Sequence, residues 1–389
     1  MNSKMVYLDN AGTTPVAKEV LEAMQPYFSE KYGNASSLHG KGREAKRALE
    51  ESRTSIAKFL NVDSNEIYFT SGATESNNLA VKGMAFANRN KGKHIIISKI
   101  EHPCIIESGA WLAKQGFEVT KLPVDQYGFV DPAELERSIR KDTILVSVMT
   151  ANNEIGTVEP VTKLAKICND RGVAFHTDAV QAYGKIPMDL KEVGMLSASS
   201  HKIYGPKGVG MLMVRHGIKL EPLISGGGHE RGLRSGTENV AGVVGFAAAT
   251  ELMKKEMPNE GERQTRLRDK LIKETLKLPE TRLNGHPTKR LPNNANFSFA
   301  YIEGESLILR LDDAGIMGST GSACSSPKLE PSHVLLSIGL PHALAHGSLR
   351  LTMGRNTTKE DIDHAIKTIP PIVEDLRKLS PLGKNSKRC

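Results

Sequence analysis

Lys202 stands where a lysine could act as a catalytic amine. It ends the string Ser199-Ser200-His201-Lys202, which follows a short apolar run and precedes the turn-forming residues Gly205 and Pro206. A catalytic lysine must be held rigidly and still reach into a cleft, and the carboxyl end of a strand in an open α/β sheet provides both. The alternative is one exposed lysine among many, and this string alone favours that alternative.

Asp178 follows a second apolar run, in the string Thr177-Asp178-Ala179-Val180-Gln181. The same argument places its side chain at the same edge of the sheet. There a carboxylate could pair with the ring nitrogen of pyridoxal phosphate, which keeps the ring cationic and makes it an electron sink. Equally, Asp178 could cap the next helix. The string supports the two interpretations about evenly.

Small residues fill the string Thr70-Ser71-Gly72-Ala73-Thr74-Glu75-Ser76-Asn77, between an expected strand and an expected helix. Unpaired backbone N–H groups at a helix start bind anions, and the Thr74 hydroxyl could add a further bond to a phosphate. The other interpretation is helix capping by Ser71 or Thr74. Capping and phosphate binding are compatible here.

His102 lies at an expected strand end, in Ile100-Glu101-His102-Pro103-Cys104. In that position an imidazole could stack on a ring and move protons. A lone histidine is more often structural, so the catalytic interpretation depends on the other residues.

Cys324 lies in the string Gly318 to Ser326, which is GSTGSACSS. Its polar, small neighbours predict an accessible thiol on a mobile loop, as a nucleophile requires. An inert surface thiol is the weaker alternative, because exposed thiols oxidise. The four cysteines, at 104, 168, 324 and 389, form no CxxC pair, so neither a zinc ribbon nor a dithiol motif is indicated.

Strands that alternate with amphipathic helices must position these residues. This alternation predicts an α/β fold with a mostly parallel, doubly wound sheet. The expected strands are Ile67–Thr70, His94–Ser98, Phe117–Leu122, Thr143–Met149, Val173–Thr177, Leu196–Ala198 and Val209–Val214, with a helix at Thr162–Asp170 among them.

The pattern changes after a long expected helix, Glu238 to Lys255, and a charged stretch, Lys254 to Lys270, that could be a hinge helix or a linker. A smaller α+β domain is expected next, with strands at Asn296–Tyr301 and Ser348–Met353 and helices at Glu305–Ala314 and Lys359–Leu379. We therefore expect a large domain at 15–258. Residues 1–14 and 259–389 form the small domain, which carries the mobile cysteine loop at about 317–330.

The composition is that of an ordinary globular protein, with 39% hydrophobic and 25% charged residues in 389. The net charge of +8 is spread along the chain and favours solubility and anionic ligands. No recognised nucleic-acid motif accompanies it, so direct nucleic-acid binding is not expected. The N-terminus lacks the apolar core of a signal peptide, and the most apolar stretch, 240–249, is too short to cross a bilayer. No membrane association is expected, and a cytoplasmic protein is predicted.

Taken together, these strings resemble the cysteine desulfurases of the fold-type I pyridoxal-phosphate enzymes, in the class V aminotransferase-like superfamily. The GSACSS loop is similar to that of the subclass with the iron–sulfur cluster and nitrogen-fixation enzymes. The matching strings keep their order nearly from end to end: LDNAGTTP (8–15), FTSGATESNNLA (69–80), EH (101–102), NNEIGT (152–157), HTDAVQ (176–181), SSHKIYGPKGVG (199–210), GGGHERGLRSGTENV (226–240), YIEGES (301–306), STGSACSS (319–326), LEPSHVL (329–335), HGSLRLTMGR (346–355) and LSPL (379–382).

The resemblance implies three catalytic residues: Lys202 bonds the cofactor covalently, His102 stacks on its ring, and Cys324 receives the sulfur. It also implies cofactor contacts and two substrate contacts. Asp178 would face the ring nitrogen, Gln181 and Asn153 the ring hydroxyl, and Ala73, Thr74, Ser199 and His201 the phosphate, with Thr237 of the partner subunit reaching over; Arg350 and Asn34 would bind the substrate carboxylate.

The activity implied is conversion of L-cysteine to L-alanine, with a persulfide on Cys324 and Lys202 or His102 moving the α-proton. A homodimer would then donate sulfur to an iron–sulfur scaffold protein, with a cluster shared briefly through Cys324 as its only metal. Alternatives are a selenocysteine lyase, another pyridoxal-phosphate enzyme of the class V family, or an inactive binding platform. The platform is considered because the stretch around Val193-Gly194-Met195 is shorter than expected of the family, which could shift the strand before Lys202.

Overall fold

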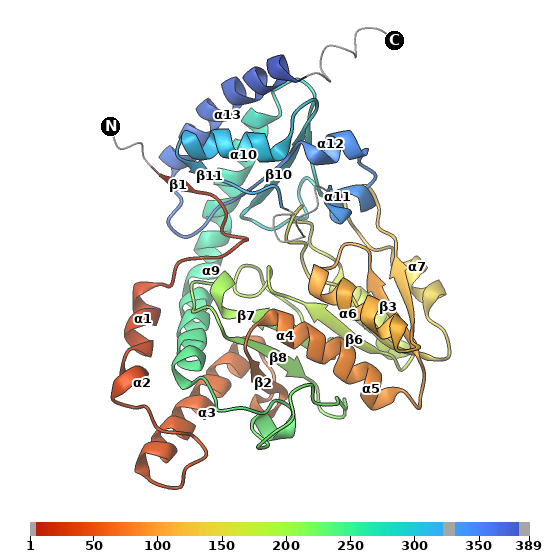
Figure 1. Cartoon of the computed structure of the whole chain (residues 1–389), viewed down its shortest axis with the longest axis vertical. Helices are drawn as coiled ribbons and strands as arrows, with labels where there is room; N and C mark the ends of the chain where they lie inside the picture. The colour runs from red at the N-terminus through yellow and green to blue at the C-terminus, as the bar shows by residue number, and fades with distance from the viewer. Residues whose placement is uncertain (1–4, 322–330, 381–389) are drawn as a thin grey trace.

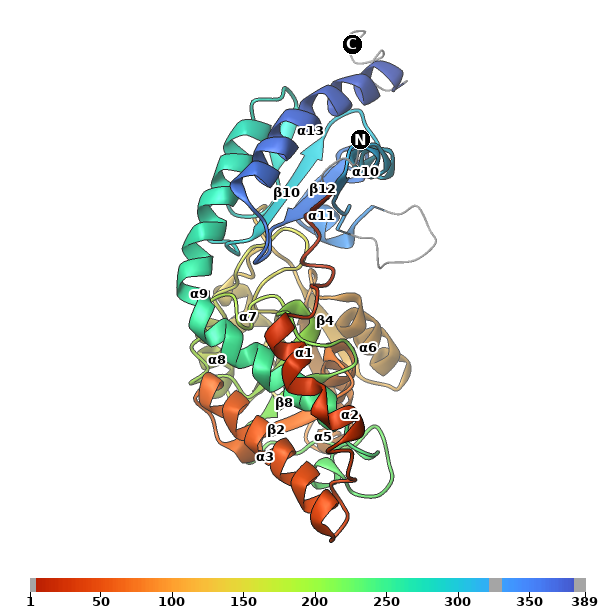
Figure 2. The same ribbon diagram turned by 90° about the vertical axis from the view of Figure 1, so that its left-hand side faces the viewer.

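The computed structural model describes residues 5–321 and 331–380. Figure 1 shows two parts, one around a large sheet and one around a smaller sheet, and Figure 2 shows helix α9 (Val240–Thr275) running along both. The N-terminal segment also passes between them. Its strand β1 (Val6–Tyr7) pairs with β11 (Ile316–Met317) beside the smaller sheet, whereas helix α1 (Lys18–Met24) contacts α9 beside the large one.

The large sheet has seven strands in the order β2-β8-β7-β6-β5-β3-β4. Strands β7, β6, β5, β3 and β4 are parallel, while β8 runs antiparallel to both of its neighbours. The expected α/β fold with a mostly parallel sheet is therefore confirmed. The strands are β2 (Ile67–Thr70), β3 (His94–Ser98), β4 (Glu118–Leu122), β5 (Thr143–Ser147), β6 (Ala174–Asp178), β7 (Met195–Ser199) and β8 (Gly210–Val214).

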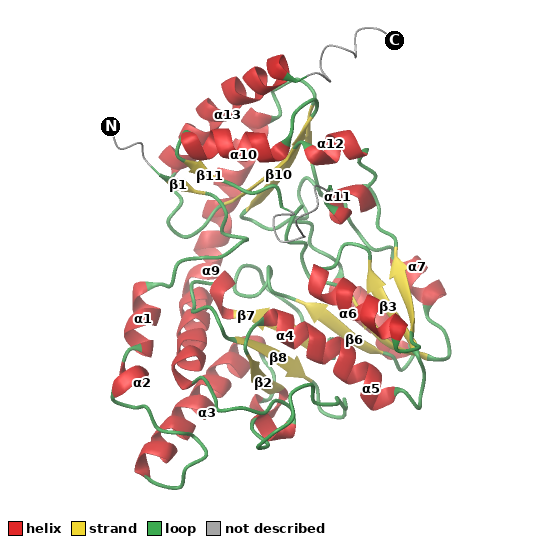
Figure 3. Ribbon diagram, viewed as in Figure 1, coloured by secondary structure: helices red, strands yellow, loops and turns green. Residues whose placement is uncertain are grey.

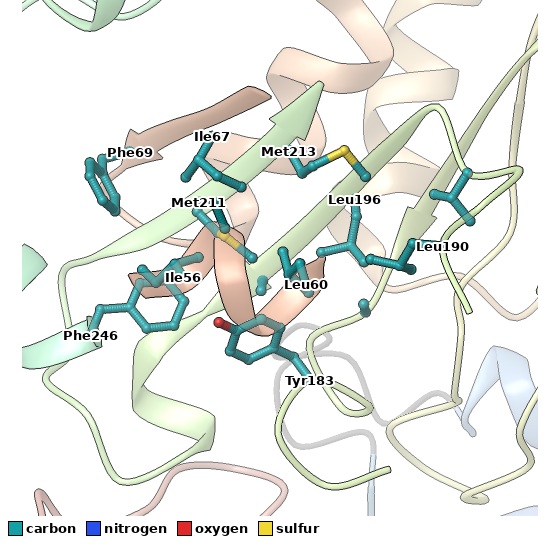
Figure 4. Packing of buried hydrophobic residues seen from close by; sticks show 14 of the residues in the cluster. Ile56, Leu60, Ile67, Phe69, Tyr183, Leu190, Leu196, Met211, Met213 and Phe246 are labelled. Atoms are coloured by element: carbon teal, nitrogen blue, oxygen red, sulfur yellow. The ribbon is translucent and has the colours of Figure 1, made fainter. Parts of the chain in front are cut away.

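Helices cover both faces of this sheet (Figure 3), which explains why β3, β5, β7 and β8 are buried at every position. They are α3 (Gly40–Leu60), α4 (Ala73–Asn78), the π-helix η2 (Leu79–Gly83), α5 (Met84–Asn88), α6 (Pro103–Lys114), α7 (Pro132–Ser138) and α8 (Val161–Asp170). Side chains alternate between the faces along each strand. Thus Met211 and Met213 join the cluster formed with α3 and α9, which Figure 4 shows, and Leu212 joins the opposite cluster.

The smaller part is built on a three-stranded antiparallel sheet, in the order β12-β10-β9. Its core takes in Leu8 from the N-terminus and Leu271 from the end of α9. The strands are β9 (Thr281–Leu283), β10 (Asn294–Phe299) and β12 (Ser348–Thr352), and the helices are α10 (Gly304–Asp313), α11 (His333–Ser337), α12 (His342–His346) and α13 (Lys359–Leu379).

Helix α9 continues without a break from Val240 to Thr275, so the expected boundary at 258/259 falls inside one helix. The charged stretch 254–270 belongs to that helix. The division into a large and a small domain at these positions stays a prediction.

Strand β7, which leads to Lys202, pairs regularly with both neighbours from Met195 onward. The short stretch before it therefore leaves the strand intact, and the reason for considering an inactive platform disappears. In the part of the chain that the structure describes, no helix combines the length and apolar character that crossing a membrane requires.

Candidate active site

The carboxyl ends of β6 and β7 form the floor of the candidate site. Asp178 is the last residue of β6, and Ser199 is the last of β7, followed by a 3-10 turn from Ser200 to Lys202. The two strands are parallel neighbours, with Asp178 beside Ser197. Asp178 and Lys202 therefore lie at one edge of the sheet, as the sequence predicted.

Asp178 is a buried carboxylate with two donors. Its Oδ2 accepts a hydrogen bond from Nδ2 of Asn77, on α4, at 2.7 Å, and its Oδ1 accepts one from the Val180 N–H at 2.9 Å. The second bond closes a local turn. No helix lies between β6 and β7, so the interpretation of Asp178 as a helix cap is wrong. The two donors fix the orientation of the carboxyl group at the strand end, where it can face a cationic ring nitrogen.

The N-terminal segment Asp9–Thr13 brings four of the predicted residues together. Lys202 Nζ donates to the carbonyls of Ala11 and Gly12 at 2.5 Å each, and Gln181 Nε2 donates to the Ala11 carbonyl at 3.0 Å. The remaining two contacts are His201 Nδ1 with Thr13 Oγ1 at 3.0 Å and Arg350 with Asp9 Oδ1 at 2.8 Å. The string LDNAGTTP had no expected role, and these contacts supply one.

His102 begins helix α6 as its N-cap, and its Nδ1 accepts from the Cys104 N–H at 3.2 Å. Because Nδ1 is an acceptor, the ring proton of the neutral imidazole lies on Nε2. Burial lowers the pKa of His102, so the neutral form is favoured. The Cys104 sulfur is 3.0 Å from Nδ1 and 3.2 Å from Asn77 Nδ2. A chain of polar contacts thus joins His102 to Asp178.

The turn at residues 70–74 packs against the end of β7. Gly210 pairs with Ser199 on one side and with the end of β2 on the other. A Cβ on Gly210 would lie 2.7 Å from the Gly72 Cα, so only glycine permits this approach. Gly72 itself has φ of 155°, and Ala73 starts the helical run that continues through α5. The N–H groups at this start fit an anion, with the exposed Thr74 beside them.

His201 and Ser200 lie on the turn before Lys202. Burial, and then the charges of Lys202 and Lys207, lower the pKa of His201 to about 4, so the ring is a neutral donor at neutral pH. Ser200 Oγ is buried and makes no hydrogen bond within the described ranges.

Arg350 reaches the site from β12 in the smaller part. Its guanidinium donates to the Asn153 carbonyl at 2.9 Å and pairs with Asp9. Its Nε is buried, and no acceptor for it lies among the residues described. A fixed guanidinium with a spare donor is suited to a carboxylate ligand.

Three predicted residues are not joined to this cluster. Asn34 is exposed in the segment between α2 (Pro26–Ser29) and α3. Figure 2 shows α2 and α3 at the end of the molecule away from β12. Thr237 is exposed just before α9. Cys324 lies outside the described residues. The roles expected of all three stay predictions.

Lys185 and Asn77 belong to the site although the sequence did not single them out. Lys185 Nζ donates to Gln181 Oε1 at 3.1 Å. Burial, and then Lys202 and Arg350, lower the pKa of Lys185 to about 7. Asn77 had only its place in the string FTSGATESNNLA as a signal, because its partner Asp178 lies on another element. Lys185 lies in none of the family-like strings, and nothing in the sequence marked it.

This set of groups fits pyridoxal phosphate. It offers an amine at Lys202, a buried carboxylate at Asp178 for the ring nitrogen, and a helix start at Ala73 for the phosphate. Arg350, with its buried donor still unsatisfied among the described residues, fits the carboxylate of an amino-acid substrate.

Comparisons with known proteins agree. The family model described as aminotransferase class-V matches residues 6–364. The cysteine desulfurase IscS of Methanosarcina thermophila is 54% identical over 98% of this chain and 95% of its own. A solved NifS-like protein has a TM-score of 0.90 at 40% identity, covering 96% of this chain and 100% of that chain. A structure described as SspA in complex with cysteine has a TM-score of 0.81 at 37% identity, covering 90% and 98%.

The chain therefore belongs to the aminotransferase class-V family, with the fold-type I architecture of its pyridoxal-phosphate enzymes. Within that family it is a cysteine desulfurase, whose cofactor is pyridoxal phosphate and whose substrate is L-cysteine. The expected family, fold, activity and cofactor are confirmed.

Proposed function

We propose that this desulfurase releases L-alanine and retains the sulfur as a persulfide on Cys324, with Lys202 and His102 as the other catalytic residues. The observation that carries the proposal is the segment Asp9–Thr13, which holds Lys202, Gln181 and Arg350 around one site. The cofactor, when bound, supplies an electron sink that weakens bonds next to the substrate α-carbon.

The other groups bind and orient. Arg350, with Asn34, holds the substrate carboxylate, and Lys202 or His102 moves the α-proton. The set that holds the cofactor consists of Asp178 at the ring nitrogen, Gln181 and Asn153 at the ring hydroxyl, and Ala73, Thr74, Ser199, His201 and Thr237 of the partner subunit at the phosphate.

In the sulfur step, the Cys324 thiolate attacks the substrate sulfur. A sulfur–sulfur bond forms and the carbon–sulfur bond breaks, so the electron pair of that bond stays with the carbon side and is protonated to give alanine. The protein works as a homodimer in the cytoplasm. It passes the sulfur to an iron–sulfur scaffold protein, with a cluster shared briefly through Cys324.

Quantifying alanine and sulfide together tests this proposal. The purified protein with pyridoxal phosphate, L-cysteine and a reductant should form both products in equal amounts over many turnovers. Lys202→Ala should form neither, whereas Lys207→Ala, an exposed lysine of the same turn, should behave like the parent. Sulfide release by Cys324→Ala at the parental rate would exclude the persulfide. Neither product from the cofactor-loaded parent would exclude the whole proposal.

A further inference from the structure

Glu154 is a buried carboxylic acid without a part in the chemistry described so far. It is 3% exposed and lies between two stretches that flank residues 322–330. We name residues 319–321 the first stem and residues 331–333 the second stem. Burying a carboxyl group is costly unless it is bonded, so its contacts indicate its use.

The second stem is bonded to Glu154 through Ser332. Ser332 Oγ accepts from the N–H groups of Val334 and Leu335 at 3.1 and 3.3 Å, as the N-cap of α11. Its single proton is therefore donated elsewhere, to Glu154 Oε2 at 2.5 Å. The carboxylate thus holds the capping hydroxyl in place at the start of α11.

The first stem lies beside the same oxygen. Gly321 has φ of 88°, and a Cβ built on it would lie 3.3 Å from Glu154 Oε2 and 3.5 Å from the Glu154 Cβ and Cγ. One carboxylate therefore bonds the second stem and lies beside the first.

Glu154 is itself held firmly. Its N–H donates to Asn152 Oδ1 at 2.8 Å, and its carbonyl accepts from the side chains of Asn294 and Asn296 at 3.1 Å each. Burial raises the pKa of Glu154, and the bond from Ser332 and the nearby His333 and Arg350 act in the opposite direction.

Both stems also lead to the substrate site. Ser319 exchanges two backbone hydrogen bonds with Arg350, at 3.1 and 2.6 Å. His333 Nε2 contacts the Glu101 carbonyl at 3.0 Å, directly before His102. Moving either stem would change where the segment between them begins or ends relative to the substrate.

We infer that Glu154 is a positioning residue for sulfur transfer, which holds one end of the segment that carries Cys324 by bonding Ser332 and borders the other end at Gly321. This inference rests on the proposed role of Cys324. Glu154 then governs how often the thiol meets the substrate sulfur, and leaves the binding of cofactor and the exchange of the α-proton unchanged.

The test compares two partial reactions of the holoenzyme. Glu154→Ala should lower the single-turnover rate of persulfide formation on Cys324, followed by mass spectrometry, by about tenfold or more, because small misplacements of a reacting group are that costly. Exchange of the L-alanine α-hydrogen with D₂O, followed by NMR, involves no thiol and should stay within about twofold of the parent. The absorption of the bound cofactor should not change.

Further variants separate positioning from a general loss of structure. Glu154→Gln should recover most of the rate, since its amide oxygen can accept the Ser332 proton. Ser332→Ala should resemble Glu154→Ala, and the double variant should lose little more. Without cofactor, the amides of Val334 and Leu335 should exchange with deuterium faster in Glu154→Ala. Glu159→Gln is the matched control, a buried acid bonded to the Val130 N–H away from both stems.

If Cys324→Ala has lost activity, the proposed function stands, and three results would then overturn the role inferred for Glu154. They are parental persulfide formation in Glu154→Ala, an equal fall in α-hydrogen exchange, and failure of Glu154→Gln to recover the rate. Alanine formation that continues undiminished in Cys324→Ala would overturn the proposed function as well.

Discussion

Burial determines which thiols of this chain can react. It raises the pKa of Cys104 and of Cys168 to about 12, and a thiol must ionise to act as a nucleophile. Cys168 is packed in the main core, while Cys104 is half-buried beside Asn77 and His102. Proximity to the site therefore does not make Cys104 reactive.

Alkylation by iodoacetamide at pH 8 checks this directly. In the native protein, Cys104 and Cys168 should be labelled about a thousandfold more slowly than in protein unfolded by urea, since so little thiolate is present. Mass spectrometry of the labelled peptides gives both rates. Rapid native labelling of Cys104 would show that its thiol is exposed to reagent and ionised.

Glu101 shows a second effect of burial, on stability. Its Oε1 accepts from Ser98 Oγ and the Met149 N–H, whereas no partner for Oε2 lies in the described part of the chain. Burial raises the pKa of Glu101 to about 8. The folded protein therefore keeps a proton on Glu101 that the unfolded chain releases near pH 4.5, so stability is lost as the pH rises through this window.

Glu101→Gln keeps the shape of the protonated acid and cannot titrate. The difference in free energy of unfolding between Glu101→Gln and the parent should increase by about 1 kcal/mol per pH unit between pH 4.5 and 8. Above pH 8 this difference should stay constant. Urea titrations at several pH values measure this difference. A difference independent of pH would mean that Glu101 is ionised in the folded protein.

At the scale of elements, two of the three glycines of helix α9 lie in opposite surroundings. A Cβ on Gly261 would meet nothing within 4 Å, whereas one on Gly245 would lie 2.5 Å from the Met24 sulfur. Gly261→Ala should raise the free energy of unfolding by about 0.5–1 kcal/mol through helix propensity. Gly245→Ala should lower it by about 1–3 kcal/mol through overpacking. Urea unfolding of both variants checks the pair, and a stabilising Gly245→Ala would contradict the packing described.

The elements that the sequence predicted well are those with strong local signals. The strands of the large sheet have ends within two residues of those expected, because contiguous apolar runs such as His94–Ser98 fit only a buried strand. The direction of β8 was not predictable, since its pairing with β2 and β7 is a tertiary property. Helix α9 is longer than expected because its packing holds it together across Pro258.

In the candidate site, too, some residues were predictable from local patterns and others were not. Asp178 and Lys202 were predictable together, because parallel strands end at one edge. The contacts of Asp9 with Arg350, of Asn77 with Asp178 and of Glu154 with Ser332 join residues far apart in the chain. No local pattern marks such pairs, and only the folded chain brings them together.

For the whole molecule, the N-terminal segment joins the two cores, as helix α9 also does. Leu8 packs in the core of the smaller part and Ala17 in that of the larger part. Between them, Thr352 donates its N–H to the Leu8 carbonyl at 2.7 Å, and Thr14 Oγ1 donates to the His201 carbonyl at 2.9 Å. The position of β12 relative to the large sheet therefore depends on this segment, and so does the position of Arg350.

Asp9→Asn should separate substrate binding from the later steps. In the ion pair of Asp9 with Arg350, the side chain of Asp9 is 28% exposed and that of Arg350 is 6% exposed. Removing the charge of Asp9 frees the Arg350 guanidinium to turn away from the substrate carboxylate. KM for L-cysteine should rise by about three- to tenfold, with kcat and cofactor absorption little changed. Glu19→Gln, which breaks the more exposed pair with Arg355, should leave KM as it is. A fall in kcat at unchanged KM would instead assign Asp9 to the chemistry around Lys202, through the neighbouring carbonyls of Ala11 and Gly12.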